Sequence, residues 1–248
     1  WEDLILPEET RSQLLELEIW LKHKDFLLKE WEMQRKLKPG YKALFFGPPG
    51  TGKTLTAALL GKRMGLDVYR IDLSRLVSKY IGETEKNLAK VFDRAERQNW
   101  ILFFDEADAL FGKRTSVSDA HDRYANQEVS YLLQRIEEYD GLVILATNLK
   151  NNLDEAFMRR FQASIFFPIP QAAERKTLWE RGFPEKATLE AKVNLYELAQ
   201  NYELSGGSIL NAIQHSLLMA LDHNDRIIRM DDIREGVRRE FQKVGRTI

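Results

Sequence analysis

The sequence predicts an α/β fold, in which helices flank a parallel sheet, followed by a small all-α domain. Short apolar runs alternate with helical patterns, which is typical of parallel strands covered on both faces. The apolar runs occupy residues 43–46, 68–72, 101–104, 142–147 and 164–167. From Ala172 onward the pattern is helical only. We therefore expect an α/β domain over residues 1–170 and a helical domain over residues 171–248.

The segments between and before the apolar runs carry helical periodicity. Residues 54–64, 83–97 and 123–138 are predicted helices. Residues 8–38 are highly charged, with leucine, isoleucine and tryptophan at helical spacing. They predict one long or two shorter amphipathic helices in a leading segment over residues 1–40, which the sequence Lys38-Pro39-Gly40 ends.

Composition excludes several classes of site. The 248 residues are 44% hydrophobic and 30% charged, with a formal net charge of −1. This balance does not favour a nucleic-acid partner. Without cysteine there can be no disulfide, thiol catalysis or thiolate metal site. The four histidines show no ligand spacing.

The chain lacks the signals of export or membrane insertion. No apolar run reaches the ~18 residues that a membrane span needs. The opening residues WEDLILPEE have no signal-peptide character, and the missing initiator methionine indicates a fragment of a longer chain. We expect a soluble, cytoplasmic protein without a membrane span.

A phosphate-binding loop directly follows the first apolar run. The sequence GPPGTGKT fits the pattern G-x-x-x-x-G-K-[ST] between a strand and a helix. Its backbone N–H groups and the helix N-terminus favour a bound phosphate. Lys53 is expected at the β- and γ-phosphates and Thr54 at Mg²⁺. The expected nucleotide contacts are Gly47, Pro48, Pro49, Gly50, Thr51, Gly52, Lys53, Thr54 and Leu55.

Carboxylates follow the third apolar run, in the sequence ILFFDEAD. A buried strand would bring Asp105 to the carboxyl edge of the sheet, where ligands bind in open α/β folds. Asp105 would hold Mg²⁺ through water, and Glu106 would accept a proton from the attacking water. The alternative is an acidic helix N-cap after a strand.

Together, GPPGTGKT and ILFFDEAD in this order resemble the AAA family of ATPases, within the AAA+ superfamily. The resemblance covers nearly the whole chain and implies a P-loop NTPase sheet, a helical lid domain, ATP and Mg²⁺ as ligands, and ATP hydrolysis. Strings such as SKYIGETEKNL, DEADALFGKR and DRYAN also resemble bacterial ATPases encoded with contractile injection systems.

Further polar positions match this family pattern. Asn148, after the strand LVILAT, resembles the sensor 1 residue that orients the attacking water; alternatively it caps a turn. Arg159 and Arg160 in LDEAFMRRF resemble the arginines that reach the neighbouring subunit's nucleotide. Here they are adjacent, whereas the family often spaces them, and we favour Arg160 because it precedes Phe161. The alternative is a pair of solvated surface arginines.

The resemblance also implies an assembly. An arginine acting on the next subunit requires a head-to-tail interface, which closes into a ring. The family implies a hexamer, whereas the spacing of residues does not give the number of subunits.

Two segments are expected to surround the nucleotide base. Gly206 and Gly207 in LSGGS resemble the sensor 2 turn, where glycine allows close backbone approach; the alternative is a plain helix cap. The arginine that many relatives carry after this turn is absent. Asp3, Leu4 and Ile5 resemble the segment that lines the adenine pocket.

The segment SKYIGETE, residues 78–85, resembles the family's pore loop. Lys79, Tyr80, Ile81 and Gly82 would grip an extended protein substrate in the centre of the ring. Alternatively, Tyr80 and Ile81 belong to a hydrophobic cluster at a helix start. Residues 112–126 would form a second pore-facing or interface loop, with Lys113, Arg114 and His121 as candidates.

The sequence leaves three alternative functions open. The leading one is a ring-forming, chaperone-like ATPase that remodels, unfolds or disassembles protein complexes. The second is an ATP-gated loader or switch that acts on a nucleic-acid-bound or other partner complex. The third is an ATP-binding scaffold with little turnover, which Glu106 and Asn148 do not favour.

Overall fold

The structure is a computed structural model that describes residues 1, 4–38, 40–74, 83–110, 120–148, 155–224 and 226–246. Side chains of residues 83–85, 109–110, 120–128 and 155–156 lie outside this description. The contacts divide the chain into two compact units. The first contains Trp1, Glu8–Gly47 and Lys53–Phe167, and the second contains Glu2–Pro7, Pro48–Gly52 and Pro168–Ile248.

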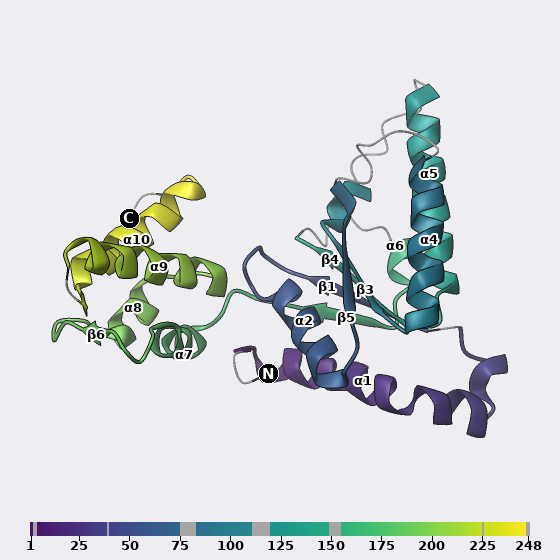
Figure 1. The fold of residues 1–248 in the computed structure, drawn as a ribbon, viewed down its shortest axis with the longest axis horizontal. Coiled ribbons are helices and arrows are strands. Elements are labelled where there is room, and N and C mark those ends of the chain that lie inside the picture. The colour runs from purple at the N-terminus through teal and green to yellow at the C-terminus, as the bar shows by residue number, and fades with distance from the viewer. Residues whose placement is uncertain are drawn as a thin grey trace. The chain divides into compact units, whose positions relative to one another are not determined.

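The first unit is built on a parallel sheet, as the apolar runs predict. Among the described residues the sheet has five strands in the order β2-β3-β4-β1-β5 (Figure 1). The strands are β1 Tyr41–Phe46, β2 Val68–Asp72, β3 Ile101–Asp105, β4 Leu142–Thr147 and β5 Ala163–Phe166. The apolar runs thus correspond to strands, and the predicted α/β class is confirmed.

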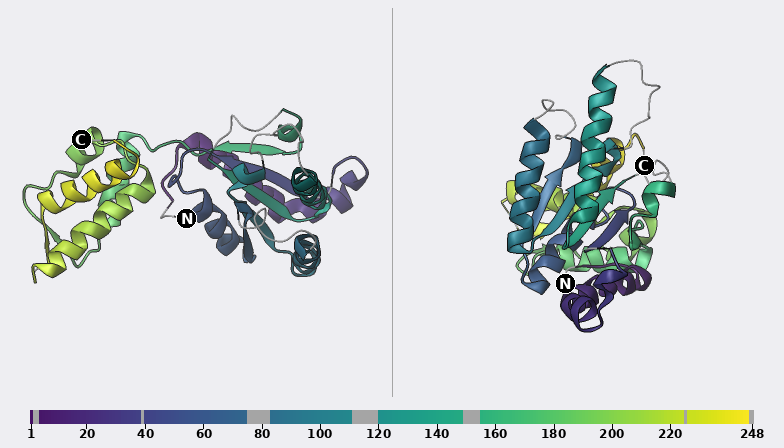
Figure 2. Two further views of the ribbon diagram at one scale, coloured as in Figure 1. Left: turned by 90° about the horizontal axis from the view of Figure 1, so that it is seen from above. Right: turned by 90° about the vertical axis from the view of Figure 1, so that its right-hand side faces the viewer.

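Helices α4 (Glu83–Gln98) and α5 (Ala120–Glu138) run side by side on one face of this sheet (Figures 1 and 2). Phe92 of α4 and Ile136 of α5 pack with alternate strand residues, including Leu44, Leu102 and Leu145. Side chains alternate across a strand, so Phe45 and Phe103, which are also buried, point to the opposite face.

Helices α1 (Glu8–Asp25) and α2 (Lys53–Met64) complete the first unit. They contact each other, and α2 contacts β2, β3 and β4. The chain continues from α1 into a π-helix, Phe26–Glu30, and a short 3-10 helix, Met33–Arg35. The expected amphipathic segment is therefore one main helix with two irregular turns. The short helix α6, Glu155–Met158, precedes β5.

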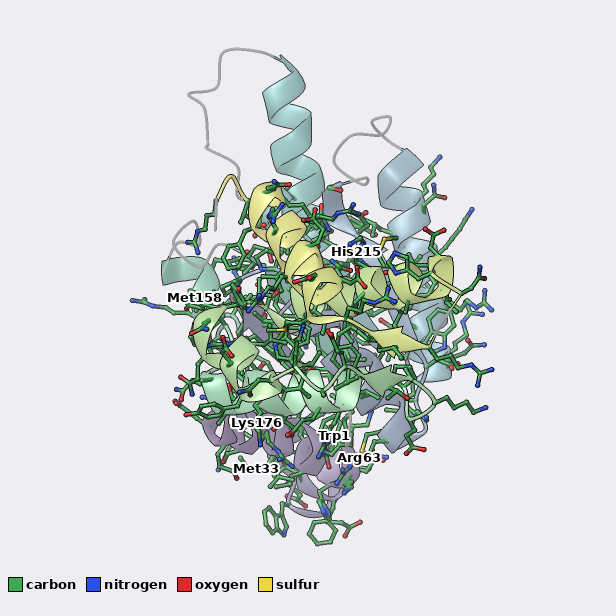
Figure 3. All side chains as sticks on the ribbon, turned by 90° about the vertical axis from the view of Figure 1, so that its left-hand side faces the viewer. Trp1, Met33, Arg63, Met158, Lys176 and His215 are labelled. Carbon is green, nitrogen blue, oxygen red and sulfur yellow. The ribbon has the colours of Figure 1, made fainter. Side chains whose placement is uncertain are left out.

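The amino-terminal tryptophan is anchored to α2. The Arg63 guanidinium lies over the Trp1 ring at 5.1 Å, and Arg63 also pairs with Glu18 of α1 at 3.1 Å (Figure 3). Glu18 is buried, whereas the Arg63 side chain is 43% exposed, so this ion pair is partly shielded from water and ties α1 to α2.

The second unit is mainly helical. Its helices are α7 Ala172–Gly182, α8 Leu195–Asn201, α9 Gly206–Asp222 and α10 Met230–Lys243. Asn194 caps α8 and Ser205 caps α9 through side-chain oxygens. Trp179, Ile209, Ile233 and Val237 belong to the buried cluster of this unit.

The expectation of helices only beyond Ala172 is wrong in one detail. Thr188–Leu189 and Ile227–Ile228 form a two-stranded parallel ladder, β6 and β7. Each strand has two residues, too few for an alternating pattern to be visible in the sequence. No described helix has the length and apolar character to cross a membrane.

Candidate nucleotide site

Lys53 is the first residue of α2 and is buried. Its ammonium group donates hydrogen bonds to the Gly47 carbonyl at 2.6 Å and to Asn148 Oδ1 at 3.0 Å. Asn148 directly follows β4, so its place beside the lysine comes from the pairing of β1 with β4. The structure thus brings together the phosphate-loop lysine and the residue that resembles sensor 1.

Burial lowers the pKa of Lys53 to about 8, and the charges of Asp105 and Asp108 partly oppose this shift. An ammonium group that has lost part of its hydration is poorly compensated by neutral carbonyl oxygens. Negative charge on a phosphate would stabilise the ammonium form that burial disfavours, so the environment of Lys53 fits an anionic ligand.

Thr54 and Asp105 provide hard oxygen atoms at one point. Thr54 Oγ1 lies 3.4 Å from Asp105 Oδ2, and Asp105 Oδ1 accepts a hydrogen bond from the Glu106 amide at 3.0 Å. Asp105 is the last residue of β3, at the carboxyl edge of the sheet. Mg²⁺ prefers such oxygen ligands and usually retains water as well, so these residues fit a magnesium ion.

Glu106 is exposed and has a left-handed backbone conformation, with φ of 54°. This conformation is uncommon outside glycine and occurs often at functional sites. Glu106 directly follows β3, so it is the residue next to Asp105 in the chain but is not part of the strand. Glu106, where a proton acceptor is expected, thus has an uncommon backbone conformation.

Sequence reasoning assigned no role to Asp108 or Arg70. Asp108 accepts hydrogen bonds from the Thr147 hydroxyl and from the Asn148 amide, the latter at 3.1 Å, and so holds the end of β4. Arg70 Nη2 lies 2.7 Å from Asp105 Oδ2. The acidic run in DEAD was the available signal for Asp108, whereas nothing local marks Arg70 as a neighbour of Asp105.

The middle of the phosphate loop, Pro48–Gly52, belongs to the second unit. The Gly207 amide donates to the Gly50 carbonyl at 2.9 Å. A Cβ atom on Gly207 would lie 3.2 Å from Gly50 Cα, so this approach requires a small residue. Gly206 begins α9, and the turn therefore reaches the phosphate loop itself.

Other expected contact residues vary in exposure. Thr51 is buried and donates to the Pro48 carbonyl at 2.8 Å, whereas Pro49 and Leu55 are exposed. Leu4 is buried and Ile5 is half-buried. A Cβ atom built on Gly52 would lie 3.7 Å from Leu4 Cδ1, so Leu4 packs beside the phosphate loop within the second unit.

The two adjacent arginines lie at the end of α6 and are both exposed. Arg160 forms an ion pair with Glu137 of α5. Glu137 also lies 3.8 Å from Lys38. Within one chain, Arg160 thus has an acidic partner that is not part of the group formed by Lys53, Thr54, Asp105 and Asn148.

Several expected residues lie outside the described part of the chain. They are Asp3, the proposed pore-loop residues Lys79, Tyr80, Ile81 and Gly82, and Lys113 and Arg114 of the second loop. His121 lies within α5, but its side chain is not described.

An apolar groove of about 620 Å³ lies elsewhere in the first unit, between the leading helices and β1. Trp20, Phe26, Trp31 and Tyr41 are among its lining residues. It contains none of the phosphate-loop or acidic residues, so it is separate from the candidate nucleotide site.

A parallel sheet, a phosphate loop after β1, a carboxylate after β3 and a polar residue after β4 define a P-loop nucleotide-binding protein. The model of the family "ATPase family associated with various cellular activities (AAA)" matches residues 43–169. The chain belongs to the AAA family of ATPases.

Curated proteins of the family resemble this chain at moderate identity. An uncharacterized AAA family ATPase, y4kL of Sinorhizobium fredii, is 41% identical over 152 residues, 60% of this chain and 46% of that protein. The proteasome-activating nucleotidase of Methanopyrus kandleri is 33% identical, over 87% of this chain and 52% of its own length. The cell division cycle protein 48 homolog of Archaeoglobus fulgidus is 32% identical, over 86% of this chain and 29% of its own length.

The chain therefore spans about half the length, or less, of these curated relatives. What it shares with them is the ATPase domain.

Proposed function

We propose that this chain binds ATP with Mg²⁺ and hydrolyses it to ADP and phosphate. The observation that carries the proposal is the convergence of Lys53, Thr54, Asp105 and Asn148 at the carboxyl edge of the sheet. The phosphate-loop residues 47–55 would bind the phosphates, with Lys53 as their cation. Thr54 and Asp105 would hold the metal, which supplies positive charge to the phosphates when bound.

Glu106 and Asn148 are proposed as the catalytic residues within one chain. The Glu106 carboxylate would accept a proton from the attacking water. The Asn148 amide would orient this water, after the phosphates have drawn the Lys53 ammonium away from Asn148 Oδ1. Leu4 and Ile5, with Asp3, would contact the base, and Gly206 and Gly207, in the proposed lid domain over residues 171–248, would allow close backbone approach to the nucleotide.

At the level of the whole protein, we propose a ring-forming ATPase that remodels protein complexes. Similarity to the cell division cycle protein 48 homolog and to the proteasome-activating nucleotidase supports this class. Arg160, with Arg159 beside it, would stabilise charge on the neighbouring subunit's nucleotide. Lys79, Tyr80, Ile81 and Gly82 would contact the protein substrate, and the expected subunit number is six.

The proposed cellular setting is the cytoplasm, and the connection with contractile injection systems stays a prediction from short sequence strings. The alternative of an ATP-gated loader on nucleic acid has no specific support among the described residues. The near-neutral formal charge of −1 does not favour it.

The test of assembly is native mass measurement of Glu106→Gln with saturating ATP. This variant should bind ATP without hydrolysing it and should accumulate as a closed oligomer. A protein that co-purifies with this variant, and leaves when ATP is removed, would identify the substrate. If the ATP-bound variant stays monomeric at concentrations where the parent hydrolyses ATP, the ring proposal fails.

A second experiment addresses threading. Tyr80→Ala should retain basal ATP hydrolysis and lose remodelling of the identified substrate. Normal remodelling by this variant would contradict the pore-loop role and leave the ATPase proposal intact.

A further inference from the structure

An arginine forms an ion pair with the carboxylate that is proposed to hold the metal. Arg70 Nη2 lies 2.7 Å from Asp105 Oδ2, within hydrogen-bonding distance. The same oxygen lies 3.4 Å from Thr54 Oγ1. The Arg70 side chain is 59% exposed and that of Asp105 is 15% exposed, so a mostly exposed cation contacts a largely buried anion.

The pairing of β2 with β3 produces this contact. Asp72 lies opposite Asp105 in the register of the two strands, and Arg70 lies opposite Phe103. Residues two apart share a face of the sheet, so Arg70 and Asp72 are on the same face as Asp105. Asp72 itself accepts hydrogen bonds from the amide and the hydroxyl of Ser74. Arg70 therefore directs its cation along the sheet to the Asp105 carboxylate.

We propose that Arg70 is a positioning residue that competes with the divalent cation for Asp105 Oδ2. The inference rests on the magnesium site proposed above. A guanidinium on Asp105 Oδ2 would repel a nearby metal ion and would fill the place of the metal-bound water that this carboxylate is expected to hold, so the metal must displace Arg70 from the carboxylate. Arg70 thereby lowers the affinity of the site for divalent cations and holds Asp105 oriented toward Thr54 while the metal is absent.

The phosphates of a nucleotide change this balance. They add negative charge beside Thr54 and Lys53, which favours the metal and offers the released guanidinium another anionic partner. Arg70 thus makes metal binding depend on nucleotide. Since the arginine is mostly exposed, water and salt screen the ion pair, and its loss should change metal affinity by about three- to tenfold.

The test is electron paramagnetic resonance titration of free Mn²⁺, a spectroscopic substitute for Mg²⁺, against the full chain with saturating ADP. Arg70→Met should bind Mn²⁺ about three- to tenfold more tightly than the parent. Arg70→Gln should show the same increase, and Arg70→Lys, which keeps the charge but not the planar fork, an intermediate one.

Arg97→Met is the matched control. Arg97 is exposed on α4, near the opposite end of β3, and its removal changes the net charge equally. Its Mn²⁺ affinity should equal that of the parent. If Arg70→Met and Arg70→Gln bind Mn²⁺ as tightly as the parent or more weakly, the role of Arg70 is overturned and the proposed magnesium site is not. A parent chain that binds no Mn²⁺ with ADP would instead contradict the proposed magnesium site.

Discussion

The left-handed backbone conformation of Glu106 distinguishes it from Asp105, the adjacent carboxylate for which a different role is proposed. Asp105 is the last residue of β3, and its Oδ1 accepts a hydrogen bond from the Glu106 amide. The turn at Glu106, with φ of 54°, lets its own side chain leave the line of β3. Such a conformation costs on the order of 1 kcal/mol for a residue other than glycine, so the fold must hold it in place.

The Glu106→Gln substitution keeps the size of this side chain and removes its basicity. We expect ATP hydrolysis to fall by roughly 10²–10⁴-fold, with unchanged nucleotide affinity. Phosphate release and fluorescent-nucleotide binding measure the two quantities. Glu180→Gln, an exposed change on α7, is the control and should hydrolyse at the parental rate. Full activity of Glu106→Gln would exclude Glu106 as the base.

Lys42 is a buried cation that the sequence did not reveal. It lies within β1, and its ammonium donates to the Tyr139 carbonyl at 2.8 Å. Burial lowers the pKa of Lys42 to about 8, although the charges of Asp140 and Glu137 oppose the shift. The unfolded chain, where the pKa is near 10.5, binds this proton more tightly than the folded chain. The Lys42 contribution to stability therefore rises with pH between these two values.

We expect the free energy of unfolding of the parent, relative to Lys42→Met, to rise by about 1–2 kcal/mol from pH 8 to pH 10. Lys53 is present in both proteins and cancels in the difference. Burial also raises the pKa of Tyr41 and Tyr139, which removes stability only above pH 10. Denaturant unfolding at several pH values measures the difference, and parallel profiles for the two proteins would contradict it.

Local motifs explain which residues of the site were predictable. Lys53, Thr54 and Asp105 could be predicted as site residues because a phosphate loop and an acidic strand end are short, contiguous patterns. Lys42 and Arg70 were missed because their partners lie 97 and 35 residues away in the sequence. Periodicity shows that a strand is buried, but not which strand will pair beside it.

At the scale of elements, the apolar runs predicted the positions of the strands well. The apolar run over residues 142–147 coincides with β4, and that over 68–72 with β2. The ends of other elements differ by one or a few residues, because strand ends depend on partners and not on composition. The ladder of β6 and β7 was missed for the same reason, since only the partner strand defines it.

The packing of α9 against α10 depends on one glycine. A Cβ atom on Gly236 of α10 would lie 2.8 Å from the Ala212 carbonyl oxygen and 2.9 Å from Ala212 Cα. Glycine to alanine normally stabilises a helix by up to about 1 kcal/mol. Here the methyl group would meet backbone atoms, and the helices must separate.

We therefore expect Gly236→Ala to lower the free energy of unfolding by about 1–3 kcal/mol, opposite in sign to helix propensity. Thermal and denaturant unfolding of the full chain measure this change. The control is Arg238→Ala on the exposed side of α10, which should be nearly neutral. A stabilised Gly236→Ala protein would show that α9 and α10 pack less closely than described.

At the scale of the whole molecule, the arginine in trans is the central prediction. Arg160→Ala should lower ATP hydrolysis by roughly 10³-fold. When mixed with Glu106→Gln, which is itself inactive, activity should reappear. Some subunits would then have an intact Glu106 and a neighbour with an intact Arg160. Steady-state phosphate release across mixing ratios measures this recovery.

The ion pair between Arg160 and Glu137 supplies the matched control for that experiment. Glu137→Gln removes the pair within one chain and leaves Arg160 in place, so it should retain hydrolysis. Loss of activity in Glu137→Gln equal to that in Arg160→Ala would indicate a role within one chain. If Arg159→Ala is inactive and Arg160→Ala is not, Arg159 is the contacting arginine.

The hydrogen bond from Gly207 to Gly50 has a consequence for how nucleotide binding can be observed. One amide proton of the α9 turn is protected by the loop that would wrap the phosphates. The rate at which this amide exchanges with solvent deuterium therefore reports on that loop, and it can be measured without turnover, substrate or ring closure. A slower exchange rate in the presence of ADP would detect nucleotide in the phosphate loop separately from every later event in the cycle.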